Sequence, residues 1–127
     1  MLKIKPKILL IEEDQFLYKI LTVKLKRAGF DVFLAIDGEE GIKKAKETKP
    51  DLILLDLILP KINGFAVLSE IKKTPVLKKV PVVILSNLGQ ESDVEKGLRM
   101  GAEDYLIKTN LSLSEIVEKV KGYLKSK

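Results

Sequence analysis

The sequence contains no cysteine, no histidine and no tryptophan. Without cysteine the chain forms neither disulfides nor thiolate metal sites, and without histidine it has no imidazole base and no Ser-His catalytic triad. Arginine, the side chain that best binds phosphate with two hydrogen bonds at once, occurs only at Arg27 and Arg99. Any chemistry must therefore use carboxylates, hydroxyl groups, lysines or a hard cation that prefers oxygen ligands.

Long hydrophobic segments are also missing. The longest apolar runs have the length of a strand, and the basic N-terminus leads into no long apolar segment and no small-residue cleavage site, so neither a membrane span nor a signal peptide is predicted. A reducing cytoplasm is the expected location. The 127 residues are 46% hydrophobic and 32% charged, which is typical of a globular protein, and we predict a single domain over residues 1–127 with its core in residues 7–124.

The net charge of +5 comes mainly from lysines that are scattered along the chain in small clusters. Such clusters are typical of solvated helix faces, so direct nucleic-acid binding is not expected, and a basic binding face is kept as the alternative.

Short apolar segments alternate with segments whose apolar residues recur at helical spacing. Strands are predicted at residues 8–11, 32–35, 52–55, 82–85 and 105–107, and helices at 16–28, 39–48, 65–74, 91–100 and 112–124. Because the strands are continuously apolar and alternate with helices, we predict an α/β fold, an open doubly wound five-stranded parallel sheet with strand order 2-1-3-4-5 and helices on both faces.

Several residues have predicted structural roles in this fold. Ser112 and Glu115 form a capping box at the start of the last helix. The spacing of the phenylalanines places Phe16, Phe33 and Phe65 in the core. Two glycines are predicted to serve as backbone devices, either for positive φ or for helix termination, namely Gly64 and Gly101.

Polar residues follow four of the predicted strands. Glu12 and Glu13 come after the first strand, Asp56 after the third, Ser86 after the fourth and Lys108 after the fifth. The carboxyl ends of the strands form the edge at which such sheets bind ligands. Three carboxylates gathered there repel one another and raise each other's pKa, which favours a bound cation. With oxygen ligands alone, Mg²⁺ or Mn²⁺ is the expected metal.

This set of groups suits phosphoryl transfer. A transferring phosphoryl group spreads negative charge over three oxygens, which the metal, the Lys108 ammonium and the Ser86 hydroxyl can each stabilise. Asp56 is then the nucleophile and forms an acyl phosphate. An ionised carboxylate needs no general base, so the absence of histidine does not stand in the way.

The sequence resembles the receiver domains of response regulators in two-component signalling, in particular single-domain receivers similar to chemotaxis regulators. The resemblance covers residues 7–124. The elements that carry it are, in order, Glu12 and Glu13, the segment PDLILLD at residues 50–56, Pro60, Gly64, Ser86, the segment GAEDYLI at residues 101–107, and Lys108. The family has a flavodoxin-like (βα)5 fold.

The resemblance implies that Asp56 accepts a phosphoryl group from a histidine kinase or a phosphotransfer protein. It also implies that Lys108 binds this group, and that Ser86 and Tyr105 are the switch residues that change the surface of the fourth helix, fifth strand and fifth helix to control a downstream protein partner. A cytoplasmic phosphoprotein of a phosphorelay is therefore expected, monomeric or weakly dimeric, and a signalling switch rather than an enzyme. Since the chain has no histidine, its donor is another molecule.

The resemblance further implies that Glu12, Glu13, Asp56 and the backbone carbonyl of Ile58 hold Mg²⁺ or Mn²⁺. The chain departs from the family here, since Glu13 stands where the family usually has aspartate. One additional methylene moves the carboxylate oxygen, and Mg²⁺ tolerates little change in geometry, so weaker or water-mediated binding is expected.

Two further departures concern the loops around the site. Thr109 follows Lys108 where the family commonly has a cis proline, and a trans peptide bond is expected there. Ile58 and Leu88, at positions that often tune hydrolysis of the acyl phosphate in the family, are apolar and cannot orient an attacking water, so slow autodephosphorylation is expected.

Two alternatives remain open at this point. One is a pseudo-receiver, a module with the same fold that binds proteins without being phosphorylated. The departures from the family at Glu13 and Thr109 favour this alternative. The other is an enzyme or cofactor-binding protein of similar topology. Against the latter, the acidic loop at residues 12–14 would repel a phosphate unless a metal intervenes.

Overall fold

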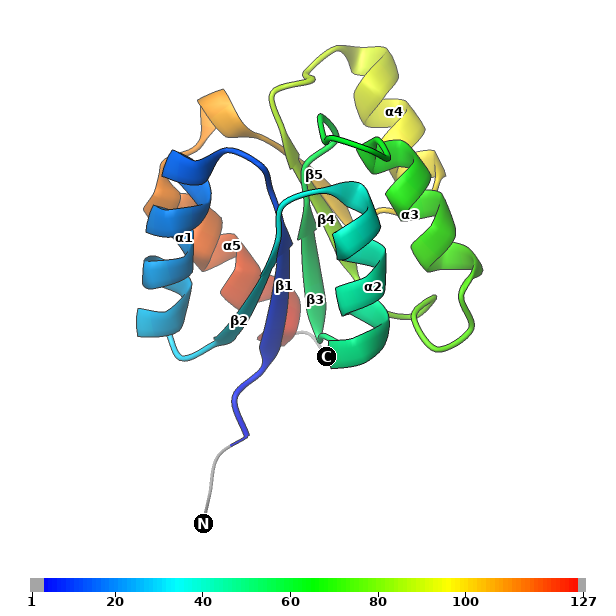
Figure 1. The fold of residues 1–127 in the computed structure, drawn as a ribbon. Helices are drawn as coiled ribbons and strands as arrows, with labels where there is room; N and C mark the ends of the chain where they lie inside the picture. The colour runs from blue at the N-terminus through cyan, green and yellow to red at the C-terminus, as the bar shows by residue number, and fades with distance from the viewer. Residues whose placement is uncertain (1–3, 126–127) are drawn as a thin grey trace.

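The computed structural model describes residues 4–125 and arranges them as a sheet covered by helices on both faces (Figure 1). The strands are β1 (Lys7–Ile11), β2 (Asp31–Ala35), β3 (Leu52–Leu55), β4 (Val82–Ser86) and β5 (Asp104–Ile107). The α-helices are α1 (Gln15–Arg27), α2 (Gly38–Thr48), α3 (Gly64–Lys73), α4 (Glu91–Arg99) and α5 (Leu113–Lys125), and a short 3₁₀ helix covers Lys108–Asn110.

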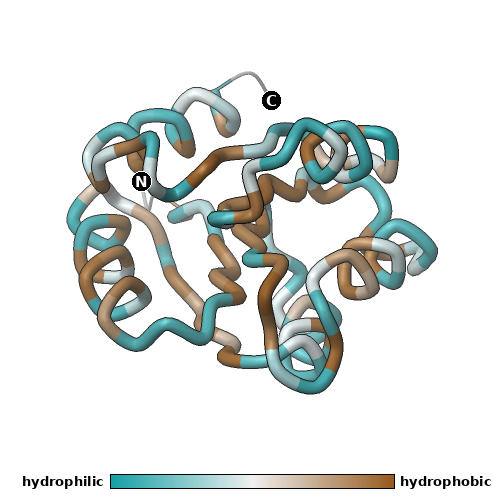
Figure 2. The backbone as a smooth tube through the Cα atoms, turned by 90° about the horizontal axis from the view of Figure 1, so that it is seen from above, coloured by the Kyte–Doolittle hydropathy of each residue, from teal (hydrophilic) through white to brown (hydrophobic). Residues whose placement is uncertain are grey.

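The sheet is parallel throughout, with strand order β2-β1-β3-β4-β5, and this confirms the predicted topology. α1 and α5 cover one face, and α2, α3 and α4 cover the other (Figure 1). Seen from above, hydrophobic segments gather in the middle, where the strands run, and hydrophilic turns lie outside (Figure 2). Within residues 4–125, no helix combines the length and the apolar character needed to span a bilayer.

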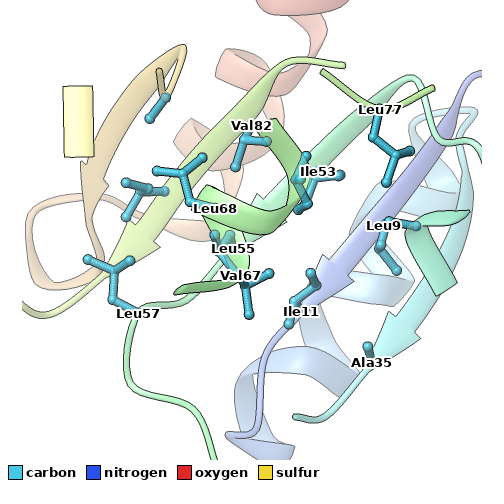
Figure 3. Close-up of a cluster of buried hydrophobic side chains, with 14 of the residues drawn as sticks. Leu9, Ile11, Ala35, Ile53, Leu55, Leu57, Val67, Leu68, Leu77 and Val82 are labelled. Carbon is cyan, nitrogen blue, oxygen red and sulfur yellow. The ribbon is translucent and has the colours of Figure 1, made fainter. Parts of the chain in front are cut away.

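Two hydrophobic clusters, one on each face of the sheet, hold the layers together. Successive side chains of a strand point to opposite faces. Leu9 of β1 and Ile53 of β3 therefore pack under α2 and α3, together with Leu68 of α3 (Figure 3). Leu10 and its neighbours on the other face pack against α1 and α5. Because both faces of the central strands are buried, these strands read as continuous apolar runs in the sequence.

The prediction that Phe16 belongs to the core is wrong, since its side chain is 80% exposed. The buried residues of α1 are Leu21 and Leu25. Phe16 lies nine residues before Leu25, which is two and a half helical turns, and so it projects from the opposite side of the helix. Phe33 and Phe65 are half-buried and pack against the core.

The helix ends follow local sequence signals. The capping box before α5 is confirmed, because the Ser112 N–H donates to Glu115 Oε1 at 2.9 Å and the Glu115 N–H donates to Ser112 Oγ at 3.1 Å. Gly101 follows α4 with a φ of +105°, as predicted. Gly64 has no positive φ; it begins α3 where a side chain would collide with the backbone of the preceding loop.

Candidate functional site

The carboxyl ends of four neighbouring strands bring the predicted site residues to one edge of the sheet. Glu12 follows β1 directly, Asp56 follows β3, Ser86 ends β4 and Lys108 follows β5. The strands are in register at these ends, since Ile11 is the partner of Leu55 and Leu55 that of Ile84. The parallel topology alone therefore places an acidic pair, a hydroxyl and an ammonium side by side.

Lys108 bridges the two buried carboxylates of the site. Its Nζ lies 2.8 Å from Glu12 Oε1 and 3.0 Å from Asp56 Oδ2. Glu12 is 1% exposed and Asp56 is 5% exposed, so both carboxylates sit in a region of low dielectric where charge pairs are strong. Burial alone would lower the pKa of Lys108, but the close pairing with Glu12 and the charge of Asp56 together raise it above its ordinary value.

Burial and the neighbouring Asp56 charge disfavour the ionised form of Glu12. Burial raises the pKa of its carboxyl, and the negative charge of Asp56 adds to the rise, although pairing with Lys108 and a backbone hydrogen bond oppose it. Glu12 Oε2 accepts a hydrogen bond from the Asp14 N–H at 3.0 Å. Glu12 Oε1 is shielded from solvent, and its contact with the ammonium lacks hydrogen-bond geometry. This oxygen can therefore still take a ligand.

Both oxygens of Asp56 are held in place. Oδ1 accepts hydrogen bonds from the N–H of Leu57 at 2.7 Å and from that of Ile58 at 3.3 Å, and Oδ2 accepts from Lys108 at 3.0 Å. Gly64 approaches from α3, where its N–H donates to the Leu57 carbonyl at 2.9 Å. The result is a fixed, nearly buried carboxylate beside an ammonium, which is the arrangement of an oriented nucleophile.

Ser86 and Tyr105 are linked through the backbone of a residue between them in space, Leu88. The Leu88 N–H donates to Ser86 Oγ at 3.3 Å, and the Tyr105 hydroxyl donates to the Leu88 carbonyl. Tyr105 is 8% exposed, so its ring lies inward in this structure. Burial raises the pKa of Tyr105 to about 12, with the charges of Asp93 and Asp56 adding to the rise. Sequence reasoning missed this bridge, because a backbone hydrogen bond leaves no signature in side-chain identity.

The four residues predicted to bind metal do not all come together. Within residues 4–125, no group of three aspartate, glutamate or histidine side chains is close enough to hold a cation. Glu12 and Asp56 share one ammonium, whereas Glu13 is exposed. Ile58 is 55% exposed, and its backbone N–H donates to Asp56 Oδ1. Of the three carboxylates predicted to lie together, Glu12 and Asp56 therefore do so. The metal-binding roles of Glu13 and of the Ile58 carbonyl stay predictions.

The chemistry of these donors nevertheless fits Mg²⁺ or Mn²⁺. Mg²⁺ commonly uses only one or two carboxylates, keeps several waters and takes the remaining ligands from a phosphate. Glu12 and Asp56 supply two buried carboxylates, and Glu12 Oε1 has no hydrogen bond of good geometry to lose.

The Lys108 loop takes the course expected from the absence of proline. The 3₁₀ helix Lys108–Asn110 begins at the lysine itself. No cis peptide bond occurs anywhere in residues 4–125, so the bond between Lys108 and Thr109 is trans, as predicted. The lysine still reaches Asp56, which means that a cis proline is not required to direct it there.

Comparison with known proteins assigns the chain to a family. Residues 8–121 match the model of the response regulator receiver domain. The chain belongs to the response regulator receiver family.

Three similar proteins illustrate the range of the family. RpaA of Synechocystis, described as a DNA-binding dual master transcriptional regulator, is 38% identical over 120 residues, which are 94% of this chain and 49% of RpaA. The structure of RcpA, a phosphorylated cyanobacterial phytochrome response regulator, is 34% identical with a TM-score of 0.78 and covers 94% of this chain and 91% of RcpA. The receiver domain of sensor histidine kinase PA1611 from Pseudomonas aeruginosa has a magnesium ion coordinated in its active site cleft. It is 26% identical with a TM-score of 0.86, covering 96% of this chain and 99% of that domain.

The chain spans about half the length of the curated relatives it matches, 49% of RpaA and 48% of the regulator PhoP of Bacillus subtilis.

Proposed function

We propose that this chain accepts a phosphoryl group on Asp56 and responds by changing the surface formed by α4, β5 and α5, which we call the switch surface. The observation that carries the proposal is the geometry of Asp56. Its carboxylate is nearly buried, held by two backbone N–H groups and placed 3.0 Å from the Lys108 ammonium. A phosphorylated RcpA among the similar structures supports the same reading.

In the proposed step, one carboxylate oxygen of Asp56 attacks the phosphorus atom of the donor. A new P–O bond forms, the bond between phosphorus and the leaving group breaks, and its electron pair departs with the leaving group. Lys108 stays within reach of Asp56 and neutralises charge on the phosphoryl oxygens. When bound, Mg²⁺ or Mn²⁺ would be held by Glu12 and Asp56 and would supply further positive charge, and the magnesium-bound PA1611 receiver supports this choice of metal.

The donor must be a separate molecule, since the 127 residues include no histidine. We propose a histidine kinase or a phosphotransfer protein that docks over α1. Phe16, Ile20 and Val23 form an exposed apolar stripe with the spacing i, i+4, i+7 on this helix. The stripe adjoins the site, because Asp14 caps α1 through the Leu17 N–H and also donates its own N–H to Glu12. Phe16→Ser should therefore slow transfer from a phosphorylated protein more than labelling by acetyl phosphate, whereas Val76→Ser, at an exposed residue between α3 and β4, should slow neither.

The response is proposed to run through Ser86 and Tyr105. A phosphoryl group on Asp56 offers the Ser86 hydroxyl a stronger acceptor than its present environment, and its movement disturbs the bond from the Leu88 N–H. The Leu88 carbonyl holds the Tyr105 hydroxyl, so the disturbance reaches β5 and the switch surface. The proposed output is contact with a downstream protein. RpaA is described as DNA-binding, and direct contact of the present residues with nucleic acid stays an alternative, testable by salt-dependent binding to random duplex.

Loss of the phosphoryl group is proposed to be slow. The Ile58 side chain, beside Asp56, and Leu88, after Ser86, are both apolar and cannot orient water for attack on the acyl phosphate. A half-life of seconds or less with Mg²⁺ present would contradict this.

The proposed function is tested by incubating the chain with acetyl phosphate and Mg²⁺ and measuring the intact mass. We expect the mass to rise by one phosphoryl group, and the rise to be lost in Asp56→Asn and in samples from which the metal has been chelated. An unchanged mass under all conditions would favour the pseudo-receiver, which binds partners without phosphorylation.

A further inference from the structure

α4 comes close to the sheet with its backbone at Gly97, and its Val94 side chain packs against the core. The buried residue of this helix is Gly97, and the other residues of the helix are exposed or half-buried. A Cβ atom added at Gly97 would lie 2.6 Å from Ile84 Cδ1 of β4 and 3.1 Å from Tyr105 Cδ2 of β5. The first distance is shorter than two carbon atoms can approach, and the second is tighter than an ordinary contact, so that the ring or the helix would have to shift by a few tenths of an ångström. The Tyr105 ring and the end of Ile84 therefore occupy the space that a side chain at position 97 would need.

The helix itself gives no reason for a glycine at this position. Glycine is among the poorest helix formers, and α4 has only nine residues. Gly122 in α5 provides the comparison within the chain, because a Cβ added there meets nothing within 4 Å. Gly97 and Gly122 thus differ in one respect that matters. Position 122 has open space, whereas position 97 lies against the ring of Tyr105.

We infer that Gly97 is the positioning residue that allows Tyr105 to lie inward beneath α4. The inward ring is 8% exposed, and its hydroxyl reaches the Leu88 carbonyl, whose N–H in turn holds Ser86 Oγ. A methyl group at position 97 would displace the ring outward or lift α4 from the sheet. We expect either movement to lengthen or break the hydrogen bond from the Tyr105 hydroxyl to the Leu88 carbonyl. The inference deepens the proposed function, since it rests on that function only for the role of Tyr105 as a switch residue.

The experiment compares Gly97→Ala with Gly122→Ala by NMR of the full chain carrying ring-labelled tyrosine, without any phosphodonor. Tyr105→Phe identifies the Tyr105 signal among the three tyrosines. We expect Gly97→Ala to shift this signal toward the value of an exposed tyrosine, and Gly122→Ala to leave it in place. An unshifted Tyr105 signal in folded Gly97→Ala overturns the inference.

A second variant covers the case in which Gly97→Ala fails to fold. Ile84→Val removes the Cδ1 atom closest to the added Cβ, so the double variant Ile84→Val/Gly97→Ala keeps the conflict with the Tyr105 ring and relieves the other one. The Tyr105 signal should again shift relative to Ile84→Val alone. If it stays at the position seen in Ile84→Val, the methyl group does not displace the ring and the inference is wrong.

A functional measurement separates this inference from the proposed function. Labelling of the wild-type chain by acetyl phosphate tests the phosphoacceptor, and the tyrosine signal tests Gly97 without any phosphoryl group. A shifted signal in a chain that takes no phosphoryl group supports the positioning role and refutes the proposed function. If the chain is labelled but Gly97→Ala leaves the Tyr105 signal unshifted, the proposed function is supported and the positioning role of Gly97 is refuted.

Discussion

Replacing Gly64 with alanine should destabilise the fold at the point where α3 meets the phosphoacceptor loop. An added Cβ would lie 2.4 Å from the Asp56 carbonyl oxygen and 2.4 Å from Leu57 Cα. Backbone atoms cannot swing aside as the end of a side chain can, so we take the upper part of the range for overpacking, ~3 kcal/mol. The better helix propensity of alanine returns at most ~1 kcal/mol, because Gly64 is the first residue of α3 and not an interior one. The net loss in the free energy of unfolding is therefore at least about 2 kcal/mol.

Urea denaturation of Gly64→Ala measures this loss directly, and thermal unfolding should show a fall in Tm of about 8 °C for a chain of this size. Gly122→Ala is the matched control, because its Cβ meets nothing within 4 Å and its stability should stay level or rise. The Asp56 carbonyl must also move in Gly64→Ala, so labelling by acetyl phosphate should be slower. A variant at least as stable as the wild type, with the control behaving as expected, would refute this account of how α3 is seated.

Three further outcomes are expected. Ser112→Ala removes the acceptor of the Glu115 N–H and should lower the free energy of unfolding by ~1 kcal/mol in urea, and a change within error would mean that the capping box adds no stability. Burial raises the pKa of Tyr105 to about 12 from an ordinary value of 10.0, so the fold favours the protonated form. The stability linked to Tyr105 is present below pH 10 and is lost as the pH rises toward 12. The difference in tyrosinate absorbance between wild type and Tyr105→Phe should therefore appear near pH 12, and a difference that appears near pH 10 would contradict the raised pKa. Phe16→Ser should leave stability within ~0.5 kcal/mol, whereas the buried Leu21→Ala should cost ~3 kcal/mol, and equal effects would contradict the observed orientation of α1.

Most of the fold was predictable because the central strands are buried on both faces. A short, continuous apolar run such as that of β3 then indicates a buried parallel strand. The short connections between strands and helices leave few possible topologies for the sheet. The orientation of Phe16 was not predictable from spacing alone, since α1, which Asp14 caps, exposes a second apolar stripe. An exposed stripe and a buried one have the same period, and only the packing of α1 on the sheet distinguishes them.

The site was predictable to the extent that topology determines it. Asp56 and Lys108 follow strands whose ends are in register with their neighbours, so their meeting required only the correct strand order. The backbone bridge at Leu88 and the close approach at Gly64 depend on distances between segments, which side-chain identity does not encode. For the same reason, the separate position of Glu13 became apparent only in the structure.

The central claim is that Asp56 carries the phosphoryl group, and chemical trapping tests it most directly. The chain is incubated with acetyl phosphate and Mg²⁺, treated with borohydride, which reduces an aspartyl phosphate to homoserine, and then digested and sequenced by mass spectrometry. The geometry of Asp56 and Lys108 predicts homoserine at position 56 and at no other position. An unreduced Asp56, or trapping at another carboxylate in its place, would contradict the account.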